Sequence, residues 1–204
     1  MPAIVGVPEP IQRLTEAEYL ERERLAEFKS EFYDGEIFAM SGGTPPHSLI
    51  AANAIGELHG KLKGGSCNVY TSDLRLKIEA TGLITYPDFS VVCGPVQFAE
   101  DTDDTVVNPT LVGKVLSDSS EAYDRGKKFE NYRRMPSLRE YLLISQKEAR
   151  IELFSRREDG GWILRDAAGL DGALDLPSLN VTLALKEVFA GVQFVPAPLR
   201  SPKP

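Results

Sequence analysis

The sequence predicts an α/β (α+β) domain in which a mixed β-sheet is flanked by helices. The chain has 204 residues, a length that suits one domain with its own buried core. Hydrophobic residues make up 42% and charged residues 26% of it, as in an ordinary globular protein. Its patterns follow the order helix, hairpin, helix, strands, helix, strands, without an internal repeat. We expect one domain over residues 14–192, between a flexible arm (1–13) and a disordered tail (193–204).

The N-terminal part of the domain predicts a helix followed by a β-hairpin. Thr15 and Glu18 stand at capping-box spacing, which indicates a helix over residues 15–28. The pair Asp34-Gly35 then separates two apolar-rich runs between residues 31 and 40. Because Asp-Gly favours the tight turns that match the twist of paired strands, this segment predicts a hairpin.

A second helix and two strands are expected next. Thr44 suits an N-cap and Pro45 suits the first helical position, and apolar residues then recur at helical spacing as far as residue 63. Apolar runs at 69–79 and 83–92 predict two strands.

The remainder of the chain predicts more strands around one helix. Residues 94–108 form an acidic segment that is typical of a loop, and residues 110–116 form a short apolar strand. A helix is expected from about residue 120 to residue 134. The last expected elements are strands at 138–145, 150–156, 162–166 and 177–185 and a short helix ending near residue 192.

Cysteine content and charge limit the classes of function. We expect Cys67 and Cys93 to be buried free thiols, because two cysteines form neither a disulfide framework nor a metal-ligand spacing. No secretory leader and no apolar run of membrane length is visible, so we expect a cytoplasmic protein without a membrane partner. The net charge of −7 counts against tight DNA binding, because proteins that hold phosphates usually present a basic face.

The first residue with chemical potential is Asp88, in the segment Tyr86-Pro87-Asp88. An ionised aspartate in an apolar strand run is costly to bury unless it has a partner or a metal. The alternative is an aspartate exposed at a strand end, since proline beside it cannot donate to a sheet.

The second is Lys114, within the apolar strand 110–116. Alternation places it on the same face as Val112 and Leu116, so its ammonium needs a counter-charge or a route to solvent. The alternative is that the side chain reaches solvent along its own aliphatic stem.

Further candidates come from a helix and from the N-terminal region. Asp124, Lys128 and Tyr132 are four apart and lie on one helical face, where the alternative is a solvated ion pair contributing ~0.3–0.5 kcal/mol. The lysine and arginine residues of this helix form the one plausible basic strip for phosphates. Glu31 and His47 are a further group, although a lone histidine on the first turn of a helix is usually exposed or capping.

Taken together, these segments resemble a known family from about residue 14 to residue 192. It is the Uma-two-type restriction endonuclease family of the PD-(D/E)XK nuclease superfamily, long catalogued only as a domain of unknown function. The segments that carry the resemblance are Pro87-Asp88, Ser117-Asp-Ser-Ser-Glu-Ala-Tyr-Asp124-Arg-Gly-Lys-Lys128-Phe, Tyr132 and Pro136-Ser-Leu-Arg-Glu140-Tyr141.

The resemblance implies a restriction-endonuclease-like fold and a metal-dependent endonuclease that hydrolyses phosphodiester bonds of DNA. It implies that Asp88 binds Mg²⁺ or Mn²⁺ and that Lys128 is the catalytic lysine. Glu31 would be an auxiliary acid, and His47 and Asp124 would line the pocket. A hard divalent ion in such a site is held by carboxylates and waters, and it activates water and stabilises charge on the phosphate.

The chain departs from the family pattern at Lys114, which stands where the family has the glutamate that is the second metal ligand. Two like charges ~4 Å apart repel by ~4 kcal/mol at an effective dielectric of 20. Lys114 could instead pair with Asp88 and occupy the place of the metal, whereas Asp118 is an uncertain substitute ligand. Lys114 therefore argues for weak or absent metal binding.

Three hypotheses of function remain from the sequence. The first is a metal-dependent endonuclease, impaired or not by Lys114, and the second is a non-catalytic protein of the same fold that binds nucleic acid or a protein partner. The third, an unrelated small-molecule hydrolase, lacks a nucleophile elbow, a phosphate loop or a Cys/His cluster to support it. We also expect a homodimer, formed through the apolar strands near the C-terminus.

Overall fold

The computed structural model describes residues 13–40 and 42–194, and it has the mixed α+β fold that the sequence predicts. The strands of this part of the chain form three sheets rather than the single sheet that we expected. The arm expected at 1–13 and the tail expected at 193–204 lie almost wholly outside the described residues.

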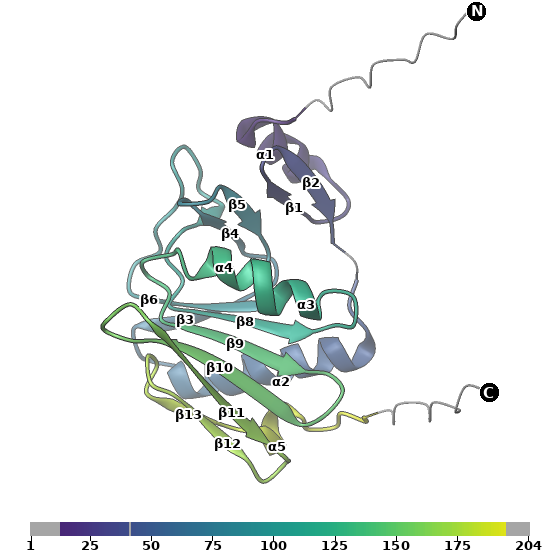
Figure 1. Ribbon diagram of the computed structural model, residues 1–204, viewed down its shortest axis with the longest axis vertical. Coiled ribbons are helices and arrows are strands. Elements are labelled where there is room, and N and C mark those ends of the chain that lie inside the picture. The colour runs from purple at the N-terminus through teal and green to yellow at the C-terminus, as the bar shows by residue number, and fades with distance from the viewer. Residues whose placement is uncertain (1–12, 41, 195–204) are drawn as a thin grey trace, which may run out of the picture.

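The N-terminal helix and hairpin fold as predicted. Helix α1 (Glu16–Leu25) begins with the expected capping box. Strands β1 (Ser30–Tyr33) and β2 (Glu36–Ala39) pair antiparallel around the Asp34-Gly35 turn, where both residues have positive φ. Figure 1 shows this unit beside the rest of the fold.

The hairpin belongs to a five-stranded sheet with the strand order β2-β1-β5-β4-β7. The other strands of this sheet are β4 (Arg75–Ile78), β5 (Leu83–Thr85) and β7 (Thr105–Val106). Strand β7 pairs parallel with β4 and lies within the segment that we expected to be a loop. All four residues of β2 are exposed, so one edge of this sheet is open to solvent.

A six-stranded sheet with the order β11-β10-β9-β8-β6-β3 forms the centre of the molecule. Strands β8 and β9 are parallel, and the other neighbours are antiparallel. The strand predicted at 162–166 is present, and it lies at one edge of the sheet. The strands are β3 (Cys67–Thr71), β6 (Phe89–Cys93), β8 (Leu111–Leu116), β9 (Glu140–Ser145), β10 (Arg150–Arg156) and β11 (Trp162–Ala168).

The two long strands expected at 69–79 and 83–92 are each divided between the two large sheets. The first is interrupted by a turn that a hydrogen bond from Leu74 N to Thr71 O closes. The second is interrupted at Pro87, which has no N–H to donate to a ladder. An apolar run does not reveal a change of sheet, so the prediction of continuous strands was wrong. Asp88 consequently lies at the junction of the two sheets.

One face of the six-stranded sheet packs against α2 (Pro45–Leu62), which begins at the predicted Thr44 cap. A small C-terminal unit joins the same apolar core. It contains β12 (Ala173–Leu176), β13 (Val181–Ala184) and α5 (Leu185–Val188), in place of the single strand expected at 177–185.

The opposite face of this sheet is covered by the segment that was predicted as one helix (Figure 1). It consists of α3 (Glu121–Tyr123), the π-helical turn η1 (Asp124–Lys128) and α4 (Phe129–Tyr132). A π-helical turn has hydrogen bonds between residues five apart instead of four, and such turns are frequent at functional sites. Over the residues that the structure describes, no helix is both long and apolar enough to cross a lipid bilayer.

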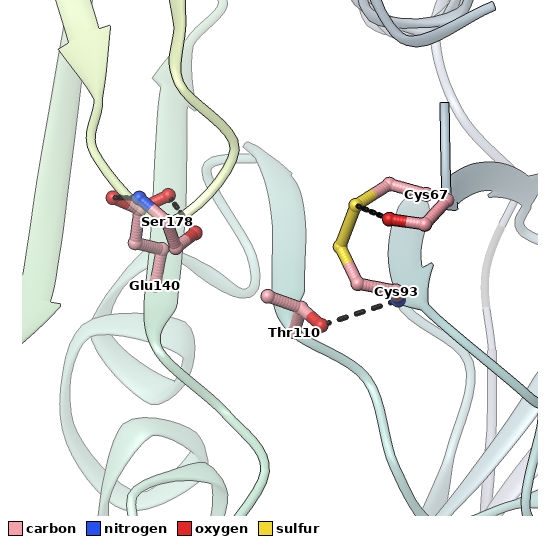
Figure 2. The surroundings of a disulfide bond; sticks show 6 residues. Cys67, Cys93, Thr110, Glu140 and Ser178 are labelled. Atoms are coloured by element: carbon pink, nitrogen blue, oxygen red, sulfur yellow. Dashed lines mark hydrogen bonds between the residues drawn. A yellow bond between two sulfur atoms is a disulfide. The ribbon is translucent and has the colours of Figure 1, made fainter. Parts of the chain in front are cut away.

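Cys67 and Cys93 form a disulfide bond, so the prediction of two free thiols was wrong. The two residues are directly opposed in the antiparallel pair β3–β6. Figure 2 shows the bond beside Thr110, whose hydroxyl oxygen accepts a 3.3 Å hydrogen bond from the backbone N–H of Cys93. The strand register that brings the two cysteines together is a tertiary property, which the cysteine count could not show.

Candidate active site

A pocket of about 910 Å³ lies where the five-stranded sheet, the six-stranded sheet and the segment α3–η1 meet. Its wall includes side chains from β1, β2, the first turn of α2, β8 and η1. Six residues that the sequence analysis singled out line it: Glu31, His47, Asp88, Lys114, Asp124 and Lys128. Tyr132, the other candidate on the helix, is buried in the apolar core and does not line the pocket.

Asp88 and Lys114 form a buried ion pair on this wall. Lys114 Nζ donates a hydrogen bond of 3.0 Å to Asp88 Oδ1, and the two side chains are 8% and 11% exposed, respectively. The pair forms because Phe89, which follows Asp88, lies opposite Gly113, which precedes Lys114, in adjacent antiparallel strands. The side chain of Lys114 therefore does not reach solvent as an isolated charge, and its counter-charge is Asp88.

The second oxygen of Asp88 is also engaged. It accepts a 2.6 Å hydrogen bond from the backbone N–H of Val115, and His47 Nε2 lies 3.6 Å away. Burial works to raise the pKa of Asp88, but Lys114, His47 and the Val115 N–H outweigh it and lower that pKa to about 2. The reciprocal effect holds for Lys114: burial works to lower its pKa, but Asp88, Asp124 and Glu31 raise it above the ordinary value. Asp88 and Lys114 are therefore both charged at neutral pH.

A second ion pair joins Glu31 of β1 to Lys128 of η1. Lys128 Nζ donates to Glu31 Oε1, and it lies 3.7 Å from Asp124 Oδ1. Glu31 Oε1 also accepts a 2.6 Å hydrogen bond from the hydroxyl of Thr85 on the neighbouring strand β5. The lysine is 5% exposed, so its ammonium is fixed between two carboxylates below the protein surface.

Asp124 is fully buried, and its two oxygens differ. Oδ2 accepts a 2.7 Å hydrogen bond from the hydroxyl of Ser120, whereas Oδ1 has no hydrogen-bond partner. Burial, with Glu31 and Asp124 nearby, raises the pKa of Tyr123 to about 12, so this phenol stays neutral. The pocket thus holds one carboxylate oxygen without a hydrogen bond beside the ammonium of Lys128.

The arrangement does not fit the divalent ion that the sequence resemblance implies. Such an ion takes oxygen ligands, usually carboxylates with waters. Both oxygens of Asp88 are engaged, one of them by the ammonium of Lys114. Within the described part of the chain, no three His, Cys, Asp or Glu side chains are grouped as metal ligands would be. The fixed cation beside Asp88 is a lysine.

Thr85 and Ser120, which hold Glu31 and Asp124, were missed by the sequence analysis. Single hydroxyl residues are common at strand and helix ends, so neither is a recognisable signal in a sequence. The exposed aromatic residues of the pocket, Phe38 and Tyr123, were also not selected. Their exposure depends on β2 being an open sheet edge and on the fold around α3, which the hydrophobic pattern does not report.

Comparisons with known proteins found a matching family model and two similar proteins. The model of the family Uma2, described as "Putative restriction endonuclease", matches residues 16–187. The uncharacterized protein slr1290 of Synechocystis sp. is 37% identical over 187 residues, which are 91% of this chain and 96% of that protein. The uncharacterized protein sll1609 of the same organism is 34% identical over 168 residues, 82% of this chain and 95% of that protein.

A solved structure shares the fold. It is the crystal structure of a "putative nuclease belonging to DUF820" from Anabaena variabilis, with a TM-score of 0.67 and 17% sequence identity. The match covers 81% of this chain and 92% of that one. At this level of identity the likeness concerns the fold alone.

Proposed function

The chain belongs to the Uma2 family, and we propose that it binds the phosphodiester backbone of nucleic acid without the metal-dependent cleavage of an active nuclease. The observation that carries this proposal is the ion pair between Lys114 and Asp88, with 3.0 Å between Nζ and Oδ1. The family relationship supports the substrate class, and the lysine supports the loss of cleavage.

The ion pair disfavours a divalent ion for two reasons. An ammonium about 4 Å from a divalent ion repels it by roughly 8 kcal/mol at an effective dielectric of 20, twice the figure for two single charges. Moving Lys114 away to admit the ion would leave the ammonium buried without its partner, which costs several kcal/mol. The pair is therefore a stable substitute for a bound cation.

The same pocket offers donors for phosphate oxygens. The ammonium groups of Lys114 and Lys128 lie on its wall, and Lys127 adds an exposed ammonium. Hydroxyl groups of Ser117 and Ser119 line the same side. Ammonium and hydroxyl groups are the usual partners of nucleic-acid phosphates. The wall also carries the carboxylates of Glu31, Asp88, Asp118 and Asp124, so binding depends on individual donors and not on a net positive charge of the pocket.

A second candidate function is a metal-dependent DNA endonuclease. It is favoured by Asp124 Oδ1, a buried carboxylate oxygen without a hydrogen bond on the wall of the same pocket. Under this alternative Lys114 would weaken the reaction without abolishing it.

A cleavage assay separates the two candidates. The purified protein and its Lys114→Glu variant are incubated with plasmid DNA and Mg²⁺ or Mn²⁺, with a chelator in parallel. We expect no cleavage by the parent protein and metal-dependent cleavage by Lys114→Glu. Lys186→Glu is the matched control, because it makes the same change of charge at an exposed position outside this pocket. Metal-dependent cleavage by the parent that is lost in Asp88→Ala would establish the second candidate.

A further inference from the structure

We infer that the pocket takes a single strand of nucleic acid, with its bases stacked on exposed aromatic side chains, rather than a double helix. This inference rests on the proposed function and specifies its ligand. Four features support it: the depth of the charged groups, a second pocket that adjoins the first, the aromatic residues that line the two pockets, and the acidic composition of the protein.

The charged groups lie below the protein surface. The side chains of Lys114, Lys128 and Asp88 are 8%, 5% and 11% exposed. A phosphate of a double helix is fixed on the outside of a stiff cylinder, so it can reach only groups that project from a protein. A single strand has free rotation about its backbone bonds, and it can carry a phosphate into a pocket.

The pocket does not end at Asp88. A second pocket of about 580 Å³ shares five wall residues with the first, which are Met40, Gly42, Gly43, His47 and Asp88. The two hollows are therefore neighbours that share the wall around Asp88 and His47, and Lys114 lines the first of them. Such a path suits a chain that passes through the site more than a ligand that ends there.

Aromatic side chains lie along both parts of this path. Phe38 and Tyr123 line the first pocket and are 47% and 37% exposed. Phe28 lines the second pocket and is 78% exposed. Stacking of a base on such a ring contributes ~1–3 kcal/mol and does not depend on the base sequence. Exposed rings at these positions are thus platforms for unpaired bases.

The acidic composition of the protein also favours a single strand over a double helix. Binding of a double helix draws much of its free energy from neutralised phosphates, and in a protein with a net charge of −7 carboxylates outnumber the cations that could neutralise them. Stacking does not require positive charge. A ligand held by a few phosphates and several stacked bases is therefore the one that this composition favours.

The test is fluorescence anisotropy with the full-length protein and labelled oligonucleotides of one sequence, as single-stranded DNA, single-stranded RNA and duplex DNA, in buffer with a chelator. We expect the single strand to bind roughly tenfold more tightly than the duplex, as a stacking contribution of ~1–3 kcal/mol implies. The affinity of the strand is expected to fall with salt less steeply than that of a protein that holds a duplex by many phosphates. A preference for DNA or for RNA would identify the sugar, and either supports the inference.

Ring-removing variants make the test specific. Phe38→Ala and Tyr123→Ala should each weaken single-strand binding about fivefold to a hundredfold, whereas Tyr123→Phe should retain it because the ring remains. Phe98→Ala is the matched control, since Phe98 is also 47% exposed but lines neither pocket. Circular dichroism of each variant shows whether the fold is kept.

Two negative outcomes have different meanings. Duplex binding as tight as single-strand binding, or strand binding that is unaffected by both ring removals, overturns this inference and leaves the proposed function standing. Failure of every oligonucleotide to bind overturns the proposed function as well.

Discussion

Lys114 Nζ lies 3.0 Å from Asp88 Oδ1, and this pair is the central feature of the pocket. The two residues are 26 positions apart in the sequence and meet because β6 and β8 are neighbouring strands. In a nuclease-family site the same place is expected to attract a divalent cation. Here it contains a cation that the chain itself supplies.

Replacing Lys114 by methionine should destabilise the protein by about 3–5 kcal/mol at neutral pH, because Asp88 would keep a buried charge without its partner. The double variant Lys114→Met, Asp88→Asn should recover part of this loss, since both groups are then neutral. Urea unfolding of the parent, of the single variants Lys114→Met and Asp88→Asn, and of the double variant measures the coupling energy between the two positions. If Lys114→Met lowers the free energy of unfolding by less than about 1 kcal/mol, the ion pair contributes no more than an exposed one, which would contradict its description as a buried pair.

The stability of the protein should depend on pH through Asp88. Its pKa is lowered from an ordinary value of 3.8 to about 2 in the folded state. Because the folded pKa is depressed, the contribution is fully present above the unfolded value, and it is lost as pH falls through the range between about 4 and 2. A difference of nearly two pKa units corresponds to about 2 kcal/mol.

Urea unfolding of the parent protein and of Asp88→Asn over this pH range measures that contribution. The variant should be less stable at neutral pH, since Lys114 loses its counter-charge, and the difference should narrow as the pH falls. If the free energies of unfolding of the two proteins differ by the same amount at all pH values, the pH dependence does not come from Asp88 and the prediction is wrong.

Gly113 should not tolerate a larger residue. A Cβ atom at this position would fall within the ring of Phe89, which is fully buried. We expect Gly113→Ala to destabilise the protein by about 1–3 kcal/mol through overpacking, and to disturb Asp88, whose N–H donates to the Gly113 carbonyl at 3.1 Å. Gly60→Ala in α2 is the control, because a Cβ there meets nothing within 4 Å and alanine favours a helix. Thermal unfolding of the two variants should shift in opposite directions.

Local signals in the sequence predicted much of the fold. The Asp34-Gly35 turn, the capping box of α1 and the Thr44 cap of α2 each involve residues that are close in the chain, so their physics is visible in a short window. The division of the apolar runs between two sheets is not set by such local signals. It depends on which strands become neighbours, and an apolar pattern is the same in either sheet. The disulfide between Cys67 and Cys93 was missed for the same reason.

The candidate site was predicted through the family resemblance rather than through any single motif. Asp88 and Lys114 each had an ordinary structural alternative, and only the register of β6 and β8 shows that they face each other. The part that we propose for Phe38, as a platform for a stacked base, could not be predicted. Its strand is apolar enough to suggest burial, yet all four residues of β2 are exposed at a sheet edge.

Calorimetric titration of Mn²⁺ and Mg²⁺ into the metal-free protein tests most directly whether Lys114 holds the place of the cation. The parent should show no stoichiometric binding, and Lys114→Glu should bind one or more ions through the new carboxylate and Asp88. Lys186→Glu, with the same change of charge outside the pocket, should behave like the parent. Stoichiometric binding by the parent that disappears in Asp88→Ala would contradict the account, because it would show that a divalent ion is held at Asp88 in spite of the lysine.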